Sequence, residues 1–559
     1  MNTHGLRLLS LGSLVFALFA SSIAATLYTC SSLGADRKVD SNKLIVYGPV
    51  PGLAPSEHYA VRVRPAGVNA PWQTPFVFKT ACKDVGGNSA GVVVEGYWCL
   101  LSGWSHSYVN FETAGPVEVE VAKADGAAIR KATVHPERFG RNIQLKNGKA
   151  YFTLEKPCLV AVDIDGAMRD QDTGLTPSGK PYSGPPIHAL SIFANPIFTN
   201  KPQLDDPTVY TVKPGEVPPT NGNWKTLAFL PGVHDIGLAY PLRTNRNYYI
   251  PGDALVYGTF NGTGIRGGGH DIRIFGCGTL SGDRLTHPAY LKPPIKGGKE
   301  GNYRDQRYIS IIIHGPYNTV VEGLTIANPA YPACNMWTAS ECDTKRPTII
   351  RWLKVLGWRV NTDAFNQPRN ALVEDCFVRT QDDTIYPCGL GIRRLVDWHD
   401  ANGSTFLFTT LSFQKSQPLV VEDCDVIFAR KRGAGGEGGR IFNMRGEGRG
   451  EGGRNVIFRN IRVEDPRPTV QAFLLQMVTE KPYAWPKPMS REPGDLTGIL
   501  FQNIQVAAPS VLGEHNIFRG GPECKIRDLT FDNVTIGGKK LTSLNDFITN
   551  KFVENFHYK

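Results

Sequence analysis

Three aspartates in two short motifs are the residues of this chain best suited to chemistry. Asp363 ends an Asn-Thr-Asp motif, and Asp382 and Asp383 end a Thr-Gln-Asp-Asp motif 19 and 20 residues further along. Carboxyl groups held close together repel, so the most enclosed one should have a raised pKa and keep its proton. A protonated carboxyl beside ionised carboxylates supplies an acid and a base able to activate water, which is what cleavage of a glycosidic bond requires.

Two other interpretations of these aspartates stay open. Aspartates of this kind also cap turns or line the solvated face of a sheet, and acids on a stacked β-fold can bind Ca²⁺. The spacing of cysteines and histidines does not resemble a zinc site. We therefore expect an enzyme without a metal and without an organic cofactor.

The aspartates lie in a series of similar segments that recurs from about residue 226 to the end of the chain. Each copy is an apolar strand, a polar pair that can turn the chain, and a second strand with alternating apolar residues. Such recurrence, without helical periodicity between copies, is typical of a β-solenoid whose coils bury a continuous core by stacking. The clearest copies are residues 320–326, 371–378, 419–427, 456–463, 499–506 and 529–536.

The spacing of the aspartates is close to one coil of a β-solenoid, so the two motifs should lie on adjacent coils about 4.8 Å apart. Successive side chains of a regular strand point to opposite faces. Asp382 and Asp383 can therefore share a patch only where their strand bends. An offset of one coil also suits the roughly 6.5–9.5 Å carboxyl separation of an inverting hydrolase better than the shorter separation of a retaining one.

The chain of 559 residues divides into four parts by composition. Residues 1–25 have the layout of a cleavable secretory signal. Residues 26–165 contain short β-rich runs between turn residues, which predicts a β-sandwich that either packs on the next domain or binds carbohydrate. Residues 166–225 are rich in Pro and Gly and should form a linker with one ordered patch at 188–196, and residues 226–559 form the solenoid.

Charge and composition limit the partners. The signal implies a secreted protein, extracellular or periplasmic, and no later stretch is apolar enough to span a bilayer, so we expect no membrane association after signal removal. The formal net charge of +10 is mostly dispersed, and nucleic-acid binding is not expected. We expect a monomer. A Gly-rich segment at 430–454, dense in arginine, is either a solvated loop or a loop that faces a substrate.

Six of the eleven cysteines have a position that favours a role. Cys376 and Cys424 occupy the position that Ile or Val takes in the other copies, so they should face the solenoid core. Local disulfides are candidates for two other pairs. These are Cys334 with Cys342 and Cys82 with Cys99.

The acidic segments resemble a known group of enzymes. Residues 357–363 (Gly-Trp-Arg-Val-Asn-Thr-Asp) and 373–383 (Val-Glu-Asp-Cys-Phe-Val-Arg-Thr-Gln-Asp-Asp) resemble the right-handed parallel β-helix glycoside hydrolases. The aspartate spacing and the order of parts are similar to the dextranase and isopullulanase family (family 49), and more distantly to the polygalacturonase family (family 28). The resemblance implies an all-β fold, with an N-terminal β-sandwich followed by a right-handed parallel β-helix of the pectin-lyase type.

The resemblance also implies roles for the aspartates. Asp382 would be the general acid, and Asp363 and Asp383 would hold the attacking water. Polygalacturonases carry Gly-His-Gly and Arg-Ile-Lys motifs after the acids, where this chain has Gly-Glu-Gly at 436–438 and Arg-Gly-Glu at 445–447. Residues near the acids or on expected loops are candidates to bind the sugar, the aromatic ones by stacking on its rings. They are Trp358, Asn361, Gln381, Tyr386 and Arg445.

The sequence therefore predicts a secreted, inverting polysaccharide hydrolase, with a dextran-like neutral α-glucan as the first substrate to test. A hydrolase of an anionic glycan is the alternative within this class, favoured by the arginine-rich segment. A polysaccharide lyase or a glycan-binding β-helix protein is the alternative from another class.

Overall fold

A computed structural model of the chain describes most residues from Asn42 to Lys559. The described ranges are 42–84, 93–140, 142–170, 186–265, 268–291, 305–337, 343–400, 402–407, 418–430, 440–445, 454–466, 470–476, 495–507, 516–522 and 524–559. The predicted signal lies outside these residues, as does most of the arginine-rich segment. Within the described ranges, no helix has the length and apolar character that a membrane span needs.

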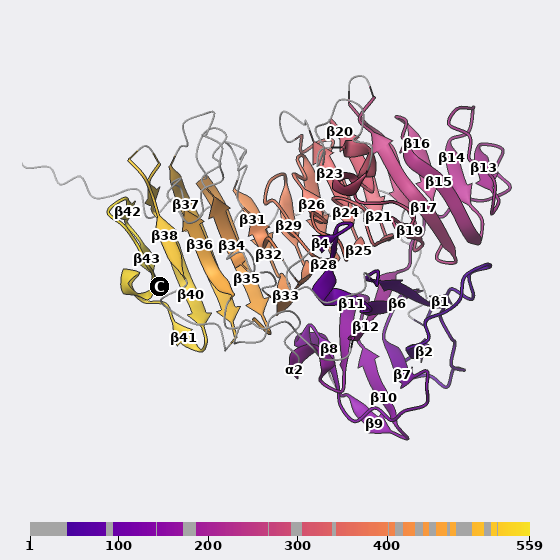
Figure 1. Ribbon diagram of the computed structural model, residues 1–559, viewed down its shortest axis with the longest axis horizontal. Coiled ribbons are helices and arrows are strands. Elements are labelled where there is room, and N and C mark those ends of the chain that lie inside the picture. Colours follow the sequence, from indigo (N-terminus) through magenta and orange to yellow (C-terminus); the bar gives the residue numbers. More distant parts are fainter. Residues whose placement is uncertain are drawn as a thin grey trace, which may run out of the picture. The chain divides into compact units, whose positions relative to one another are not determined.

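The N-terminal domain is a sandwich of two sheets (Figure 1). One face of each sheet is apolar, as the alternation of Val117, Val119 and Val121 with two glutamates predicts, and these valines are fully buried. The first sheet has the order β1 (Leu44–Val46), β6 (Ser105–Thr113), β12 (His188–Pro196), β11 (Cys158–Ile164), β8 (Ala132–His135), with β3 (Val77–Ala81) also paired to β6. The second has the order β2 (Tyr59–Pro65), β7 (Val117–Lys123), β10 (Lys149–Leu154), β9 (Gln144–Lys146).

Both predicted boundaries of the linker differ from the structure. The ordered patch at 188–196 is strand β12, which pairs parallel with β6 and antiparallel with β11 in the middle of the first sheet. The sandwich therefore extends to residue 196 rather than 165. Strand β13 (Val209–Val212) already pairs with the first strand of the solenoid. The coil stack thus begins near residue 209 rather than 226. Both ends of the predicted linker are set by strands that pair with partners elsewhere in the chain.

The rest of the chain is a parallel β-helix, as predicted (Figure 1). Its strands form three stacks in which each strand pairs with its counterpart one coil away. The first stack runs through β14 (Thr226–Phe229), β16 (Arg246–Tyr249), β18 (Ile272–Phe275), β21 (Val320–Glu322), β24 (Thr348–Arg351), β27 (Ala371–Glu374), β29 (Gly391–Arg393) and β32 (Leu419–Glu422). The second runs through β15 (Gly232–Pro241), β17 (Ala254–Gly262), β19 (Thr279–Ser281), β22 (Thr325–Ala327), β25 (Lys354–Leu356), β28 (Phe377–Thr380), β30 (Val396–His399) and β33 (Asp425–Ala429).

The third stack carries the site described below. It includes β20 (Ile311–His314), β23 (Cys334–Trp337), β26 (Phe365–Asn366), a bridge at Ile385, β31 (Ser404–Leu407), β34 (Arg440–Arg445), β36 (Gln471–Gln476) and β38 (Ile517–Arg519). Toward the C-terminus, long strands continue the first and second stacks together. These are β35 (Arg454–Val463), β37 (Leu496–Val506) and β40 (Thr530–Ile536), followed by the short strands β39 (Ile526–Arg527), β41 (Lys539–Lys540), β42 (Val553–Glu554) and β43 (His557–Tyr558).

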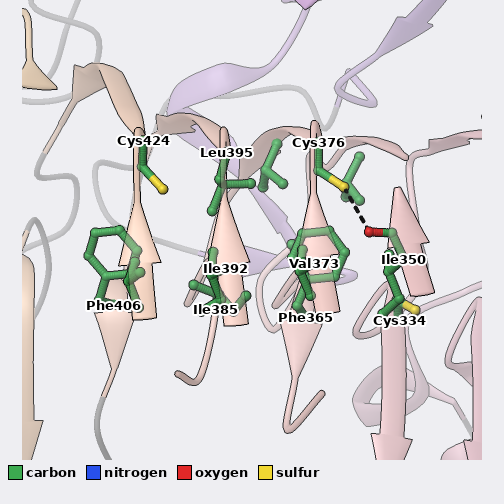
Figure 2. Close-up of a cluster of buried hydrophobic side chains, with 14 of the residues drawn as sticks. Cys334, Ile350, Phe365, Val373, Cys376, Ile385, Ile392, Leu395, Phe406 and Cys424 are labelled. Atoms are coloured by element: carbon green, nitrogen blue, oxygen red, sulfur yellow. Dashed lines mark hydrogen bonds between the residues drawn. The ribbon is translucent and has the colours of Figure 1, made fainter. Parts of the chain in front are cut away.

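Aligned side chains from successive coils fill the interior of the helix. Figure 2 shows Cys376, Leu395 and Cys424 at the same position of three coils, and the thiol of Cys376 lies 3.9 Å from the carbonyl of Ile350. Both cysteines are in the core, as predicted. The polar pair turns the chain because one residue adopts the left-handed conformation; in five of the six copies this residue is Asp or Asn, which tolerate that conformation well, and in residues 320–326 it is Gly323. Asp375 is one example, with φ of 53°.

The proposed disulfide between Cys82 and Cys99 is not formed. The thiol of Cys82 donates to the carbonyl of Trp98 at 3.8 Å, and burial raises the pKa of the Cys99 thiol. Cys334 is buried in the core of the helix, whereas Cys342 lies outside the described residues.

Candidate active site

The three aspartates lie at one corner of the β-helix, where the chain passes from the second stack to the third. Asp363 lies two residues before β26, and Asp382 and Asp383 occupy the bend between β28 and Ile385 on the next coil. Backbone hydrogen bonds fix the register of the coils here, since the amide of Ala364 donates to the carbonyl of Asp383 at 3.1 Å. Neighbouring side chains of a regular strand point to opposite faces, so Asp382 and Asp383 can share this corner only because the chain bends here.

Tyr386 joins two of the carboxylates. Its hydroxyl lies 2.9 Å from Oδ2 of Asp363 and 3.1 Å from Oδ2 of Asp383. The amide of Asn366 also donates to Asp363 Oδ2, at 3.0 Å. A phenol has one hydrogen to donate, so the two short contacts of Tyr386 are both favourable only when one of the carboxyls is protonated and donates in turn.

Asp382 has a separate set of contacts. Its Oδ2 accepts from the side-chain amides of Asn361 at 3.4 Å and Asn402 at 3.3 Å, and its Oδ1 accepts from the backbone amide of Asp383 at 2.9 Å. The aspartates are 6–7% exposed. Each therefore keeps a narrow opening to the surface while most of the carboxyl is enclosed.

The electrostatics of the corner follow from this enclosure. Burial, followed by the charges of Asp382 and Asp383, raises the pKa of Asp363 well above its ordinary value. The pKa of Tyr386 is also well above its ordinary value, because the phenol is buried and faces Asp363 and Asp383. A carboxyl in this setting keeps a proton at a pH where an exposed aspartate has lost it. Asp363 can thus keep a proton beside the other two carboxyls.

The wall behind the corner is held by a buried arginine. The guanidinium of Arg379 lies between two indole rings, 4.1 Å from the centroid of Trp358 and 4.5 Å from that of Trp398. It pairs with Asp400 through Nε at 2.9 Å and Nη2 at 2.7 Å. On the sandwich side, its Nη1 lies 3.2 Å from Nδ1 of His106.

Two predicted sugar-binding residues belong to this wall, so the prediction for them is wrong. Trp358 is 0% exposed, and its indole donates to Thr80 of the sandwich at 3.2 Å. Gln381 is also fully buried, and its amide donates to the carbonyl of Gly357 at 3.1 Å. Both lie near an acid in sequence, but Trp358 points toward the sandwich, and the amide of Gln381 points toward the carbonyl of Gly357 and the carboxylate of Asp400 within the helix wall.

The sandwich also reaches the segment that leads into Asp363. A short hairpin, β4 (Val93–Val94) and β5 (Tyr97–Trp98), places the carbonyl of Gly96 2.7 Å from the amide of Val360. The hydroxyl of Tyr97 accepts from Asn328 at 3.0 Å and from the guanidinium of Arg359 at 2.5 Å. The predicted β-sandwich domain therefore packs against the corner, which agrees with the first of its two expected roles.

The remaining predicted residues have different outcomes. Asn361 lies in the corner, in the left-handed conformation with φ of 53°. Tyr386 lies there too, as a partner of the carboxylates. Arg445 ends strand β34, and the position of its side chain is outside the described part of the structure. Asn366 and Asn402 were missed, although alignment of successive coils places both one step from an acid.

Gly403 closes the corner from the next coil. Its φ is +83°, and a Cβ built on it would lie 2.5 Å from the backbone nitrogen of Asp383 and 2.7 Å from the Oδ1 atom of Asp383. We expect Gly403→Ala to displace Asp383, lowering kcat by roughly a hundredfold and the melting temperature by a few degrees (~2–4 °C). Kinetics and thermal unfolding of the purified variant measure both. The matched control is Gly538→Ala, at φ +77° with open space around the Cβ, which should keep the activity.

A possible metal-ligand set lies elsewhere. Among the described residues, His135, Glu137 and Glu464 have ligand atoms within 4.8 Å of one another. Both oxygens of Glu464 are already used, by His135 Nδ1 at 2.8 Å and by the backbone amide of Glu137 at 2.7 Å. The group is therefore a hydrogen-bonded contact between the sandwich and the end of β35.

Fold and corner together define a parallel β-helix protein with an N-terminal β-sandwich and a cluster of three aspartates on adjacent coils. No protein-family model matches the sequence, and a search of curated proteins finds no match. Among solved structures, Dex49A from Penicillium minioluteum matches over 93% of this chain and 97% of its own, with a TM-score of 0.64 and 16% identity. The resemblance to this group of β-helix proteins is confirmed as a likeness of fold.

Two other solved structures match less well. A family 28 exopolygalacturonase of Yersinia enterocolitica matches over 78% of this chain and 96% of its own, with 11% identity and a TM-score of 0.29. A hyperthermoactive exopolygalacturonase from Thermotoga maritima matches over 62% and 79%, with 12% identity and a TM-score of 0.24.

Proposed function

We propose that this protein is an exported glycoside hydrolase that cleaves a polysaccharide with inversion, using Asp363, Asp382 and Asp383. The observation that carries the proposal is the grouping of three nearly enclosed aspartates at one corner of the β-helix, two of them bound to one phenol. A purely structural role does not account for this grouping, because like charges held together in an enclosed corner destabilise a fold, and here burial and the neighbouring carboxylates raise the pKa of Asp363.

The reaction needs one proton donor and one proton acceptor. Asp382 gives its proton to the glycosidic oxygen as the bond from the anomeric carbon to that oxygen breaks. Water, held between Asp363 and Asp383, attacks the anomeric carbon from the opposite face and gives its proton to one of these carboxylates. The proton balance is restored when that proton returns through solvent to Asp382.

The resting site adds a detail to this scheme. The raised pKa of Asp363 and the double contact of Tyr386 favour a proton on Asp363 while no sugar is bound. Asp383 is then the carboxylate that takes the proton of water, and Asp363 orients that water by donating or accepting a hydrogen bond.

A neutral α-glucan such as dextran is our first substrate candidate, and an anionic glycan is the second. The first rests on the fold shared with Dex49A and on the family resemblance of the acidic motifs, and the second rests on the arginines at 430–454. We expect new reducing ends and falling viscosity with dextran or pullulan, and little change with polygalacturonate or a sulfated glycan. The opposite order of activities would select the anionic class.

The same screen tests the alternatives from another class. A lyase would form unsaturated ends that absorb in the ultraviolet, and a glycan-binding protein would form no new ends. Circular dichroism shows whether the assayed protein is folded. Either result with a folded protein would contradict hydrolysis.

A further inference from the structure

The outward face of the third stack continues beyond the acid cluster toward the preceding coils. In β23, Cys334 and Met336 point into the core, so Asn335 and Trp337 point to the opposite, outward face. In register, Asn335 pairs with Asn366, the residue that donates to Asp363. Asn335 is therefore one coil away from a direct partner of the acid cluster, on the same face.

This row of side chains has polar atoms with no hydrogen-bond partner. The side chain of Asn335 is 0% exposed, and neither its Nδ2 nor its Oδ1 atom has a hydrogen-bond partner. The same holds for Oδ1 of Asn366, Nε1 of Trp337 and Nε2 of His314. Buried polar groups in native proteins are nearly always paired, so five unpaired atoms on four residues of three adjacent strands need a cause.

Two aromatic rings flank these atoms. His314 of β20 pairs in register with Trp337 of β23, and their ring centroids lie 6.1 Å apart with planes inclined by 20°. Both residues are partly exposed. Burial lowers the pKa of His314, so the imidazole is uncharged at neutral pH. The pair presents an uncharged aromatic surface beside unpaired donors and acceptors.

We propose that the partly exposed rings of His314 and Trp337, with the enclosed amide of Asn335 behind them, form a sugar subsite on the coils before the acid cluster, and that it binds an uncharged pyranose ring of the glycan chain. This inference rests on the proposed function and deepens it. A pyranose has hydroxyls that both donate and accept, which matches the amide of Asn335 and the indole of Trp337, and it has an apolar ring face suited to stacking on an aromatic ring.

The proposal also distinguishes neutral from charged sugars. The unpaired atoms of His314, Asn335 and Trp337 belong to neutral groups, whereas a carboxylate would call for a cation. Arg369 is a basic residue beside β23: its backbone amide donates to the carbonyl of Met336 at 3.2 Å, and its buried Nε has no hydrogen-bond partner. Binding of a uronate ring by this arginine would contradict the proposal that the subsite takes an uncharged sugar.

The test uses binding rather than turnover, so that it can be separated from the catalytic proposal. Asp382→Asn is the parent, and calorimetry measures the Kd of isomalto- and malto-oligosaccharides and of oligogalacturonates. We expect the parent to bind a neutral series, and Trp337→Ala to weaken that binding roughly five- to tenfold. Trp72→Ala, a partly exposed tryptophan of the sandwich stacked by Arg64, is the matched control and should leave Kd unchanged.

Asn335→Ala gives a second, independent readout. Removing an unpaired buried amide should raise the melting temperature of the unliganded protein while it weakens oligosaccharide binding. An asparagine with a structural role behaves in the opposite way: Asn503→Ala, which breaks an amide ladder with Asn460 and Asn533, should lower the melting temperature and leave binding unchanged.

The proposal is overturned if Trp337→Ala binds the neutral oligosaccharides as tightly as the parent, if Asn335→Ala lowers the melting temperature, or if only the oligogalacturonates bind. Failure of the catalytic proposal would give a different result. Asp382→Asn would then hydrolyse the substrate as fast as the wild type, while Trp337→Ala and Asn335→Ala would still weaken oligosaccharide binding.

Discussion

Replacing Asp382 by Asn should lower kcat by at least about a thousandfold, because general acid catalysis contributes roughly 10²–10⁴ and the amide cannot give a proton to the leaving oxygen. KM should change little, since the amide keeps the shape of the side chain and its contacts with Asn361 and Asn402. Initial rates of reducing-end release on the substrate identified in the screen measure both constants, across pH 4 to 8.

The control for this variant is Asp423→Asn. Asp423 occupies a left-handed turn between strands, with φ of 57°, and accepts from Asn460. The equivalent position of the next coil is Asn460 itself, so the substitution suits the backbone. It should leave kcat and KM as in the wild type. Wild-type activity of Asp382→Asn, with the control also active, would remove Asp382 from the mechanism.

Replacing Asp363 by Asn should make the protein less active and more stable. In the native state the pKa of Asp363 lies well above its ordinary value, because the carboxyl is buried and faces Asp382 and Asp383. Ionising it at neutral pH therefore costs free energy of folding, about 1.4 kcal/mol for each pKa unit. Asn removes that cost, and its side-chain oxygen can still accept from Tyr386 and Asn366.

The pH dependence of this gain has a definite sign. Between the unfolded pKa of about 3.9 and the raised native pKa, the folded protein holds more protons at Asp363 than the unfolded chain does. The contribution of Asp363 to stability is thus complete below about pH 4 and is lost as the pH rises through the native pKa. The melting temperature of Asp363→Asn should match the wild type near pH 4 and exceed it by roughly 1–2 °C above neutral pH.

An increase that is the same at every pH would show that the gain does not come from ionisation. Asp397→Asn is a useful comparison, since burial also raises the pKa of Asp397, but its carboxylate accepts from Thr384 at 2.8 Å and Thr405 at 2.6 Å. An amide satisfies only part of that pattern, so Asp397→Asn should be destabilised at low pH, where Asp363→Asn is neutral.

Local patterns in the sequence predicted the features that repeat from coil to coil. The recurring strands predicted the stacked helix, the alternation of side chains required a bend at Asp382 and Asp383, and the shared position of Cys376 and Cys424 placed both in the core. Each of these depends on residues within one coil or one coil apart, where the register is fixed by stacking.

Features that depend on distant pairing were not predictable in this way. Strand β12 was assigned to a linker because its partners, β6 and β11, come earlier in the chain and pair with it only in the folded sandwich. Trp358 and Gln381 lie close to the acids in sequence, which predicts substrate contacts, but in the fold Trp358 donates to Thr80 of the sandwich and Gln381 to the carbonyl of Gly357. The partners of the acids, Asn366 and Asn402, carry no signal beyond their coil position.

The stereochemistry of the first product tests the central claim most directly. Proton NMR of the reaction in its first minutes, with the substrate identified in the screen, reports which anomer is released before mutarotation. Three aspartates that hold water opposite the leaving group should release the anomer inverted relative to the bond cleaved. Release of the retained anomer would mean that one carboxylate attacks the sugar itself, and it would contradict the account given for this corner.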